Sequence, residues 1–426
     1  MRAVVYAEIG GPIRVAEVPP PECPPDGAVI EVRATGVCRS DWHAWRGHDP
    51  VPLPHVPGHE FAGVVAAVGP SVRSFAVGDR VTSPFVNGCG HCEWCRTGQA
   101  QVCPDQTQPG FTHPGSFAEQ VAVRAADLNL VRLPAEIDFV SAAALGCRFA
   151  TAFRAVAGHG RVSAGEWVAV FGCGGVGLSA VMIAAALGAR VVAIDPSPAA
   201  RDRAVALGAE AAVEPWQAGV IPPGAQSKPG AQSSEPAVQA GVIPPGAQSK
   251  PGAQSKGPAV QAGVIPPGAQ SKGEIERTTG GGAHVAIDAS GSAATAEASV
   301  RSLRRRGRHV QVGLMLGENA RAPLPWDLVI ARELEIYGSH GMAAADYPPM
   351  LAMVADGRLD PRRLVGEVIP LERAGAALAA MDEPIPRHPG ITVATPGSPG
   401  RSWTRGGLLG TDAAFVAHHN SKIGEG

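Results

Sequence analysis

The chain has 426 residues, a length that allows two or three domains with a large buried core. Its 36 basic and 38 acidic residues give a net charge of −2, which predicts neither a nucleic-acid partner nor an anionic membrane surface. The first residues lack the apolar core of a signal peptide, and no window reaches membrane-spanning length. Six of the eight cysteines are candidate metal ligands, so we expect a reducing, cytoplasmic location.

Residues 1 to about 135 have the texture of a β-rich domain. Short runs of valine and isoleucine alternate with glycine and proline turns, a pattern typical of strands joined by tight loops. The clearest strands are predicted at residues 28–33, 62–68 and 120–123.

From about residue 140 the pattern changes to strands that alternate with helices. The predicted elements are strands at 168–171, 190–195, 285–288 and 309–312, and helices at 177–187 and 201–207. This alternation predicts an α/β fold with a parallel, doubly wound sheet.

A foreign segment interrupts the alternation at residues 217–272. The motif QAGVIPPGAQSK occurs three times, starting at Gln217, Gln239 and Gln261, with a period of 22. The segment is rich in proline, glycine, serine and glutamine and holds four of the chain's five lysines. It cannot bury enough apolar surface to offset the entropy of ordering, so we expect a disordered surface insertion. A polyproline-type docking segment is the alternative.

Two further stretches stand apart from the predicted domains. Residues 396–426 show no periodicity and are expected to form a disordered tail. Five arginines between residues 301 and 308 form the strongest local charge run. We expect them at a solvated helix end before the strand at 309, with an anion site as the alternative.

Four cysteines lie within fifteen residues, at spacings that suit a tetrahedral metal site. They are Cys89, Cys92, Cys95 and Cys103. Thiolates are soft ligands, and a shell of four leaves no open coordination position, so the pattern favours a structural zinc. A disulfide pair or chance clustering is the alternative reading.

A glycine-rich loop at residues 171–177, FGCGGVG, follows a predicted strand and opens a predicted helix. Its glycines permit a tight turn and a close approach of pyrophosphate to the helix N-terminus. Asp195 ends the next strand, 18 residues after Gly177, where a carboxylate accepts hydrogen bonds from a ribose 2′-hydroxyl and repels a 2′-phosphate. The pattern favours NAD over NADP; a structural turn capped by Asp195 is the alternative.

Three more candidate metal ligands, Cys38, His59 and Cys147, lie outside the four-cysteine run. The sequence alone does not show that they converge, and each is otherwise an ordinary buried thiol or histidine. Three protein ligands with an open fourth position are, however, the arrangement in which zinc acts as a Lewis acid.

The order of these motifs resembles that of the zinc-dependent alcohol dehydrogenases, in the medium-chain dehydrogenase/reductase superfamily. The matching stretches are GVCRSDWH at 36–43, PGHEFAG at 57–63, VGDRV at 77–81, the four-cysteine run, GSFAE at 115–119, LGCRFAT at 145–151 and the glycine loop. The resemblance covers residues 1–216 and 273–395. It implies a GroES-like catalytic domain at 1–148, to which 337–395 return, and a Rossmann NAD-binding domain at 149–336.

The resemblance also implies two zinc ions per chain. Cys38, His59 and Cys147 would bind the catalytic zinc, and the four-cysteine run the structural one. Glu60 is similar to a carboxylate that approaches the metal during ligand exchange, and Asp41 to an acid that orients the ligand histidine.

The other residue roles implied by the resemblance concern the proton and the cofactor. Ser40 and His43 match a relay that carries the released proton through the cofactor ribose to water. The implied cofactor contacts are Arg39, Thr151, Gly172, Gly174, Gly175, Val176, Gly177 and Asp195.

The implied reaction is hydride transfer between NAD and a primary or secondary alcohol, or its aldehyde or ketone, in a homodimer or homotetramer. Polyol-type relatives have glutamate where Cys147 stands, so cysteine favours simple alcohols. Trp42, Phe85 and Trp326 are guesses for the substrate pocket. The alternatives are a catalytically silent zinc protein that uses the repeat as an interaction arm, and a zinc-free quinone-type reductase of the same fold.

Overall fold

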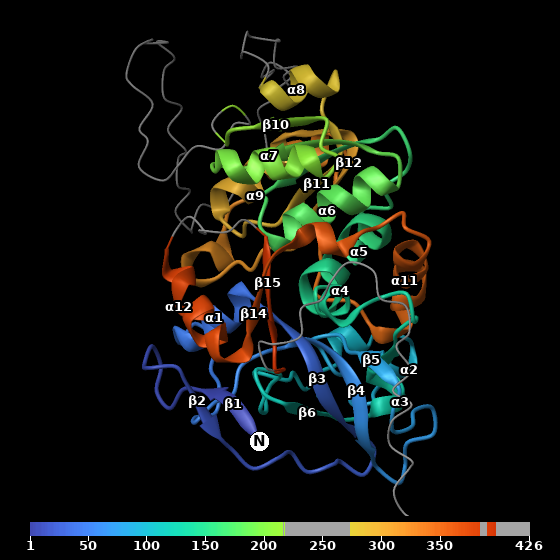
Figure 1. Cartoon of the computed structure of the whole chain (residues 1–426). Helices are drawn as coiled ribbons and strands as arrows, with labels where there is room; N and C mark the ends of the chain where they lie inside the picture. Colours follow the sequence, from blue (N-terminus) through green and yellow to red (C-terminus); the bar gives the residue numbers. More distant parts are fainter. Residues whose placement is uncertain (216, 218–272, 384–389, 398–426) are drawn as a thin grey trace, which may run out of the picture.

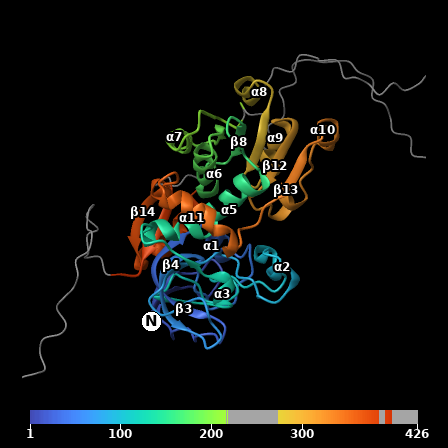
Figure 2. The same ribbon diagram turned by 90° about the vertical axis from the view of Figure 1, so that its right-hand side faces the viewer.

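The computed structural model describes residues 1–215, 217, 273–383 and 390–397, and Figures 1 and 2 show it from two sides. Its strands form a six-stranded sheet, a seven-stranded sheet and a two-stranded ribbon. Apart from Gln217, Pro396 and Gly397, the predicted insertion and tail lie outside the described residues. The expectations for both therefore stay predictions.

The six-stranded sheet is parallel throughout and runs in the order β10-β9-β8-β11-β12-β13. Its strands are β8 (Trp167–Phe171), β9 (Arg190–Ile194), β10 (Ala211–Val213), β11 (Ala283–Asp288), β12 (Leu303–Gln311) and β13 (Glu335–Gly338). Its helices are α6 (Gly175–Ala186), α7 (Pro198–Ala206), α8 (Glu274–Thr279), α9 (Ala293–Arg301) and α10 (Trp326–Ala331). From β8 the chain continues through β9 and β10 on one side of this strand, and β11, β12 and β13 follow on its other side. The strand order therefore reverses at β8, the switch point of a doubly wound sheet, as predicted.

Both faces of this sheet are buried, which explains why its strands read as continuous apolar runs. Val168 and Val170 of β8 join the hydrophobic cluster that includes α6. Trp167, Ala169 and Phe171 point the other way and join the cluster that includes α8 and α9. The six-residue helix α8 thus covers its part of the sheet through Ile275.

The seven-stranded sheet combines segments from both ends of the chain, the blue and red ribbons that lie together in Figure 1. It runs in the order β14-β15-β3-β4-β5-β7, and β6 also pairs with β3. Its strands are β3 (Ala28–Val37), β4 (Glu60–Val68), β5 (Arg80–Thr82), β6 (Gln120–Val123), β7 (Val131–Arg132), β14 (Val365–Pro370) and β15 (Ile391–Thr395). The ribbon consists of β1 (Arg2–Val5) and β2 (Arg14–Glu17). The predicted β-rich N-terminal region is confirmed, and β15 joins it by antiparallel pairing with β3.

The remaining helices are short. They are α1 (Arg39–Trp45), α2 (Glu93–Arg96), α3 (Ala126–Asn129), α4 (Phe139–Ala143), α5 (Ala150–Phe153), α11 (Tyr347–Ala355) and α12 (Ala374–Ala379). The 3₁₀ turns are Ala100–Val102, Gly317–Arg321, Ala344–Asp346, Pro361–Leu364, Leu371–Arg373 and Ala380–Asp382. Within the described ranges, no helix has the length and apolar character needed to cross a bilayer.

The arginine run differs from its prediction. Only Arg301 lies at a helix end, whereas the other four lie in β12, which begins at Leu303 instead of His309. The early start arises because Leu303 already pairs with Ala283, while the next pair is Arg308 with Val285. The residues between them bulge from the ladder, and Arg304, Arg305 and Arg306 are exposed, whereas Arg308 is half-buried and pairs with Glu166. Most of the run is thus solvated as expected, but on a strand.

His309 gives the core a pH-dependent element. The residue is 1% exposed, and its Nδ1 lies 2.9 Å from Ser299 Oγ. Burial lowers the pKa of His309 to about 4, whereas an unfolded chain has about 6.5. As pH falls from 7 to 5 the unfolded state takes up the proton first, so this residue should lower the free energy of unfolding by about 2 kcal/mol. His309→Gln should remove that part of the pH dependence in urea unfolding; an unchanged slope would contradict the assignment.

Candidate active site and metal centres

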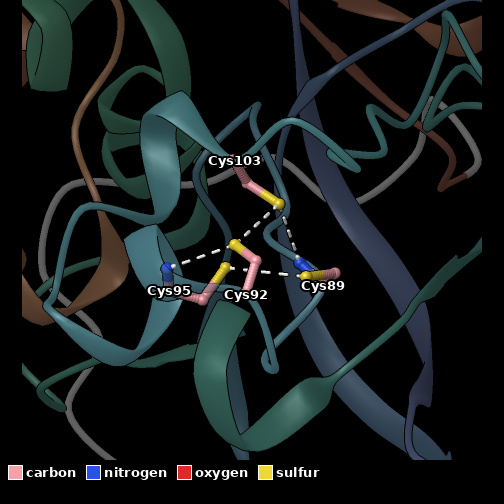
Figure 3. Close-up of side chains that lie close together, drawn as sticks. All are labelled: Cys89, Cys92, Cys95 and Cys103. Carbon is pink, nitrogen blue, oxygen red and sulfur yellow. Dashed lines mark hydrogen bonds between the residues drawn. The ribbon is translucent and has the colours of Figure 1, made fainter.

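The four cysteines of the run converge as predicted, and Figure 3 shows their side chains turned toward one another. Their sulfur atoms all lie within 4.8 Å of one another. The sulfur atoms of Cys92 and Cys103 are 3.7 Å apart, far beyond a disulfide bond, and all eight cysteines are free. Cys92 also caps α2, because its sulfur accepts the amide of Cys95 at 3.4 Å. Four convergent thiols fit a closed tetrahedral zinc site.

Strand pairing brings two of the three other ligands together. Cys38 directly follows β3 and His59 directly precedes β4, and Gly36 pairs with Glu60 across these two strands. Cys147 comes from a π-helical segment, Leu145–Phe149, that packs beside β4. The donor atoms of this set, which includes Glu60, all lie within 4.8 Å of one another. Helices with π geometry often occur at functional sites.

Asp41 holds this set from behind. Its Oδ1 accepts His59 Nδ1 at 2.9 Å and the amide of Gly58 at 3.0 Å, and its Oδ2 accepts the amide of Cys38 at 3.1 Å. The carboxylate only accepts here, so His59 carries its proton on Nδ1 and presents a lone pair on Nε2. That Nε2 is buried and has no hydrogen-bond partner among the described residues. An orphaned imidazole nitrogen beside two thiols fits a bound metal ion.

The two thiols of this set differ in protonation. A hydrogen bond from Cys147 first, and the charge of Arg148 after it, hold the pKa of Cys38 well below its usual range despite burial. A thiolate is the form of cysteine that binds metals. The same hydrogen bond with Cys38 raises the pKa of Cys147. The two sulfur atoms therefore share one proton, which metal binding would release.

Arg148 is a residue of this site that the sequence reasoning missed. Its backbone amide and Nε donate to Glu60 Oε1 at 3.0 and 2.9 Å, and a second guanidinium nitrogen donates to Glu60 Oε2. Burial raises the pKa of Glu60, and the Arg148 charge opposes that rise. A Cβ on Gly175 would lie 2.5 Å from Arg148 Cδ, so this side chain joins the metal set to the glycine loop. The signal was a lone charge in the apolar stretch 142–153.

The predicted relay residues lie on α1, which begins directly after Cys38. Ser40 Oγ is 3.8 Å from Cys38 Sγ, and His43 Nδ1 is 2.9 Å from His48 Nδ1. No hydrogen bond joins the described side chains of Ser40 and His43.

A cleft of about 970 Å³ opens at the carboxyl ends of β8 and β9. Five of the predicted cofactor contacts line it: Arg39, Gly172, Gly174, Gly175 and Asp195. A Cβ on Gly177 would lie 1.7 Å from the Gly172 carbonyl oxygen, so only glycine lets α6 start this close to the turn. Clefts at the switch point of doubly wound sheets are where these folds bind nucleotides.

The other predicted cofactor contacts do not line this cleft. Val176 packs against the core, Gly177 approaches the backbone of the turn, and Thr151 is buried in α5 with no hydrogen-bond partner for its Oγ1 in the described structure. Asp195 accepts the amides of Cys173 at 2.7 Å and Ser197 at 2.8 Å. Each carboxylate oxygen has two lone pairs, so capacity for ribose hydroxyls is left.

Aromatic rings surround His59. The Phe85 ring lies 6.1 Å from its ring centroid, and Phe111, which the sequence did not single out, lies 5.3 Å away. Trp42 donates its indole N–H to Asp382, and Trp326 is 59% exposed on α10. Among the guesses for the substrate pocket, Phe85 is thus the one that faces a candidate ligand.

Comparisons with known proteins agree with this geometry. Residues 24–135 match the family model of the alcohol dehydrogenase GroES-like domain, and residues 261–356 that of the zinc-binding dehydrogenases. The solved structure of an NAD-dependent alcohol dehydrogenase has a TM-score of 0.72 at 30% identity, covering 93% of this chain and 100% of that one. Alcohol dehydrogenase TADH from Thermus sp. ATN1 has a TM-score of 0.73 at 28% identity, covering 93% and 99%.

A curated relative gives the most direct comparison. An alcohol dehydrogenase of Geobacillus stearothermophilus is 31% identical over 375 residues, which span 87% of this chain and 93% of the relative. Identity at this level over almost the whole of both proteins shows common descent and a common fold. The chain belongs to the zinc-dependent alcohol dehydrogenase family.

Proposed function

We propose that this protein oxidises primary or secondary alcohols, or reduces their aldehydes or ketones, with NAD and a catalytic zinc. The observation that carries the proposal is the orphaned, buried Nε2 of His59, which lies beside the sulfur atoms of Cys38 and Cys147. Arg148 connects this set to the cleft at the glycine loop. A metal-binding set and a nucleotide cleft that share a side chain are suited to hydride transfer.

The protein residues hold and orient the reacting groups. Cys38, His59 and Cys147 would hold the catalytic zinc, while the four-cysteine set braces its own loop. When bound, zinc supplies Lewis acidity to an alcohol or carbonyl oxygen, and NAD supplies the hydride acceptor. Asp41 keeps the His59 tautomer that presents Nε2. Phe85 and Phe111 exclude water beside it, because their rings present only apolar surface.

Ser40 and His43 are proposed to carry the released proton toward water. Burial lowers the pKa of His43, and the neighbouring His48 lowers it further, so the ring is neutral and able to accept a proton near pH 7. Its Nδ1 already contacts exposed His48, which leads to solvent.

The proposed cofactor position rests on the first turn of α6 and on Arg39. The amides of Gly174 and Gly175 line the cleft at the positive end of α6, where a pyrophosphate is favoured, and Arg39 adds a positive charge. Val176 packs against the core, and Gly177 closely approaches the Gly172 carbonyl oxygen. Thr151, whose buried Oγ1 has no hydrogen-bond partner in the described structure, stays a proposed cofactor contact.

Asp195 is expected to set the preference for NAD. Asp195→Ala should lower kcat/KM for NAD about 10- to 100-fold, because charged hydrogen bonds to the ribose are lost, and it should raise the relative use of NADP. Asp202→Ala removes an exposed carboxylate from α7 outside the cleft and serves as the matched control. An unchanged NAD to NADP ratio in Asp195→Ala would remove Asp195 from the cofactor site.

A panel of primary, secondary and aromatic alcohols and their carbonyls, assayed with NAD and NADP, tests the function. We expect NAD-linked turnover of simple alcohols, in line with cysteine as the third ligand. No turnover of any member by zinc-loaded protein would favour the catalytically silent alternative. Turnover by zinc-free protein would favour the quinone-type reductase.

The domain division and assembly are also proposals. We propose two domains, residues 1–148 with 337–395 and residues 149–336, and their separate sheets support this division.

A homodimer or homotetramer is supported by two large apolar side chains on α10, beside the terminal strand β13 (Figure 2). They are Trp326 and Ile330, which are 59% and 78% exposed. Light scattering measures the mass of the protein in solution and so distinguishes a monomer, a dimer and a tetramer.

A cytoplasmic location is also proposed, and the eight free cysteines support it.

A further inference from the structure

The described residues contain a third group of metal-binding donors. It lies in the same lobe as the four-cysteine set, residues 89–105. The donor atoms of Cys89, His91 and Asp105 all lie within 4.8 Å of one another. Cys89 belongs to both groups. Thiolate, imidazole and carboxylate are the three side-chain ligands that Zn²⁺ uses in proteins, and three of them leave a fourth position open.

The burial of these residues gives the lobe an inner and an outer side. Cys95 and Cys103 are 6% and 1% exposed, whereas Cys89 is half-buried and His91 and Asp105 are exposed. Figure 3 shows Cys89 on one flank of the four-cysteine set. Cys89 and Cys92 are therefore the more exposed ligands of the four-cysteine set, and Cys89 is also part of the other group.

A hydrogen bond to the backbone orients the ring of His91. Its Nδ1 lies 3.0 Å from the carbonyl oxygen of Cys89, and a carbonyl only accepts. A ring proton therefore sits on Nδ1, which leaves Nε2 as the ring nitrogen that can bind a metal ion. The same hydrogen bond keeps the ring next to the cysteine that the two groups share. His59 is oriented at the catalytic set in the same way, by Asp41.

Metal exchange at a loaded four-cysteine site has a difficulty that such a group relieves. When zinc is already bound, its four thiolates leave no coordination position through which an incoming ion can attach. An outer group that shares one thiolate can hold the incoming ion while the inner bonds rearrange. The exposed carboxylate of Asp105 also attracts a divalent cation to this side of the lobe.

We propose that Cys89, His91 and Asp105 form a third, surface zinc site that captures zinc and transfers it through Cys89 to the four-cysteine set. During transfer the bonds to His91, to Asp105 and to a water molecule in the fourth position are replaced by bonds to Cys92, Cys95 and Cys103, whose thiol protons pass to water. No electrons are transferred. The inference concerns how the structural zinc is acquired and does not depend on the alcohol chemistry.

Cadmium exchange into the zinc-loaded full chain tests this site. Cd²⁺ at thiolates gives an ultraviolet charge-transfer band that reports the rate, and cadmium NMR separates the four-sulfur set from the Cys38 and Cys147 set, which has two sulfurs. We expect the double variant His91→Ala/Asp105→Asn to slow exchange at the four-sulfur set by about 10-fold or more. Its final cadmium occupancy should equal that of the unaltered chain.

The matched control is Glu93→Gln, which removes an exposed carboxylate from α2 on the same lobe but outside the group. It should exchange at the unaltered rate. Three results would overturn the proposal. They are an unaltered rate in the double variant, equal slowing in Glu93→Gln, which would indicate general charge attraction, and reduced final occupancy in the double variant, which would indicate a purely structural role.

Discussion

Alcohol oxidation is expected to disappear in the Cys147→Ala variant, while the zinc content falls from two ions per chain to one. Cys147 supplies one of the three ligands whose donor atoms converge at the catalytic set. Its removal leaves Cys38 and His59, because the carboxylate of Glu60, the other donor of the set, is held by Arg148. Two protein ligands are too few to keep the ion in place. The four-cysteine set is built from its own loop and should keep its metal. NAD reduction and metal analysis on the same sample measure both effects.

Cys23→Ala is the matched control for this experiment. Cys23 is a free, half-buried cysteine that belongs to neither zinc set, so its replacement should change neither turnover nor zinc content. Retained activity in Cys147→Ala would refute the catalytic assignment. Loss of both zinc ions would instead show that the two sets depend on each other for folding.

Arg148→Met is expected to lower the free energy of unfolding by about 3–5 kcal/mol, because it leaves the buried carboxylate of Glu60 without its counter-charge. Arg148 makes three hydrogen bonds to Glu60, and the Glu60 side chain is fully buried. The side-chain bonds are lost in this variant, whereas methionine keeps most of the apolar packing of the arginine stem. Urea or thermal unfolding of the zinc-loaded protein gives the difference.

The double variant Glu60→Gln/Arg148→Met separates charge from packing. With no buried charge left, it should regain much of the stability that Arg148→Met loses. A loss below about 1 kcal/mol in Arg148→Met, the range of exposed ion pairs, would contradict the buried pair. Equal losses in the single and double variants would assign the cost to packing.

Local sequence patterns predicted a strand or helix well where the residues of that element alone carry the signal. The apolar runs at β8 and β9 read as strands because both sheet faces are buried. The arginine run was assigned to a helix end because charges suit solvated helix termini. Its strand depends on the pairing of Leu303 with Ala283, which no local pattern contains.

The same distinction holds for the candidate site. Arg148 had a weak sequence signal, but its partner Glu60 lies on β4, in a distant part of the chain. Thr151 was named from the resemblance; it does not line the cleft, and its role as a cofactor contact stays a prediction. Whether a side chain faces a cavity depends on the packing of several elements at once, which a motif does not contain.

The sequence by itself determined the four-cysteine set and the glycine loop. In both cases all the necessary atoms come from one short segment, so spacing alone limits their geometry. Only the tertiary structure decided that Cys38, His59 and Cys147 converge, that Asp41 fixes the His59 tautomer and that Arg148 neutralises Glu60. Those contacts depend on the pairing of β3 with β4 and on the helical segment packed beside them, which are formed by residues distant in the chain.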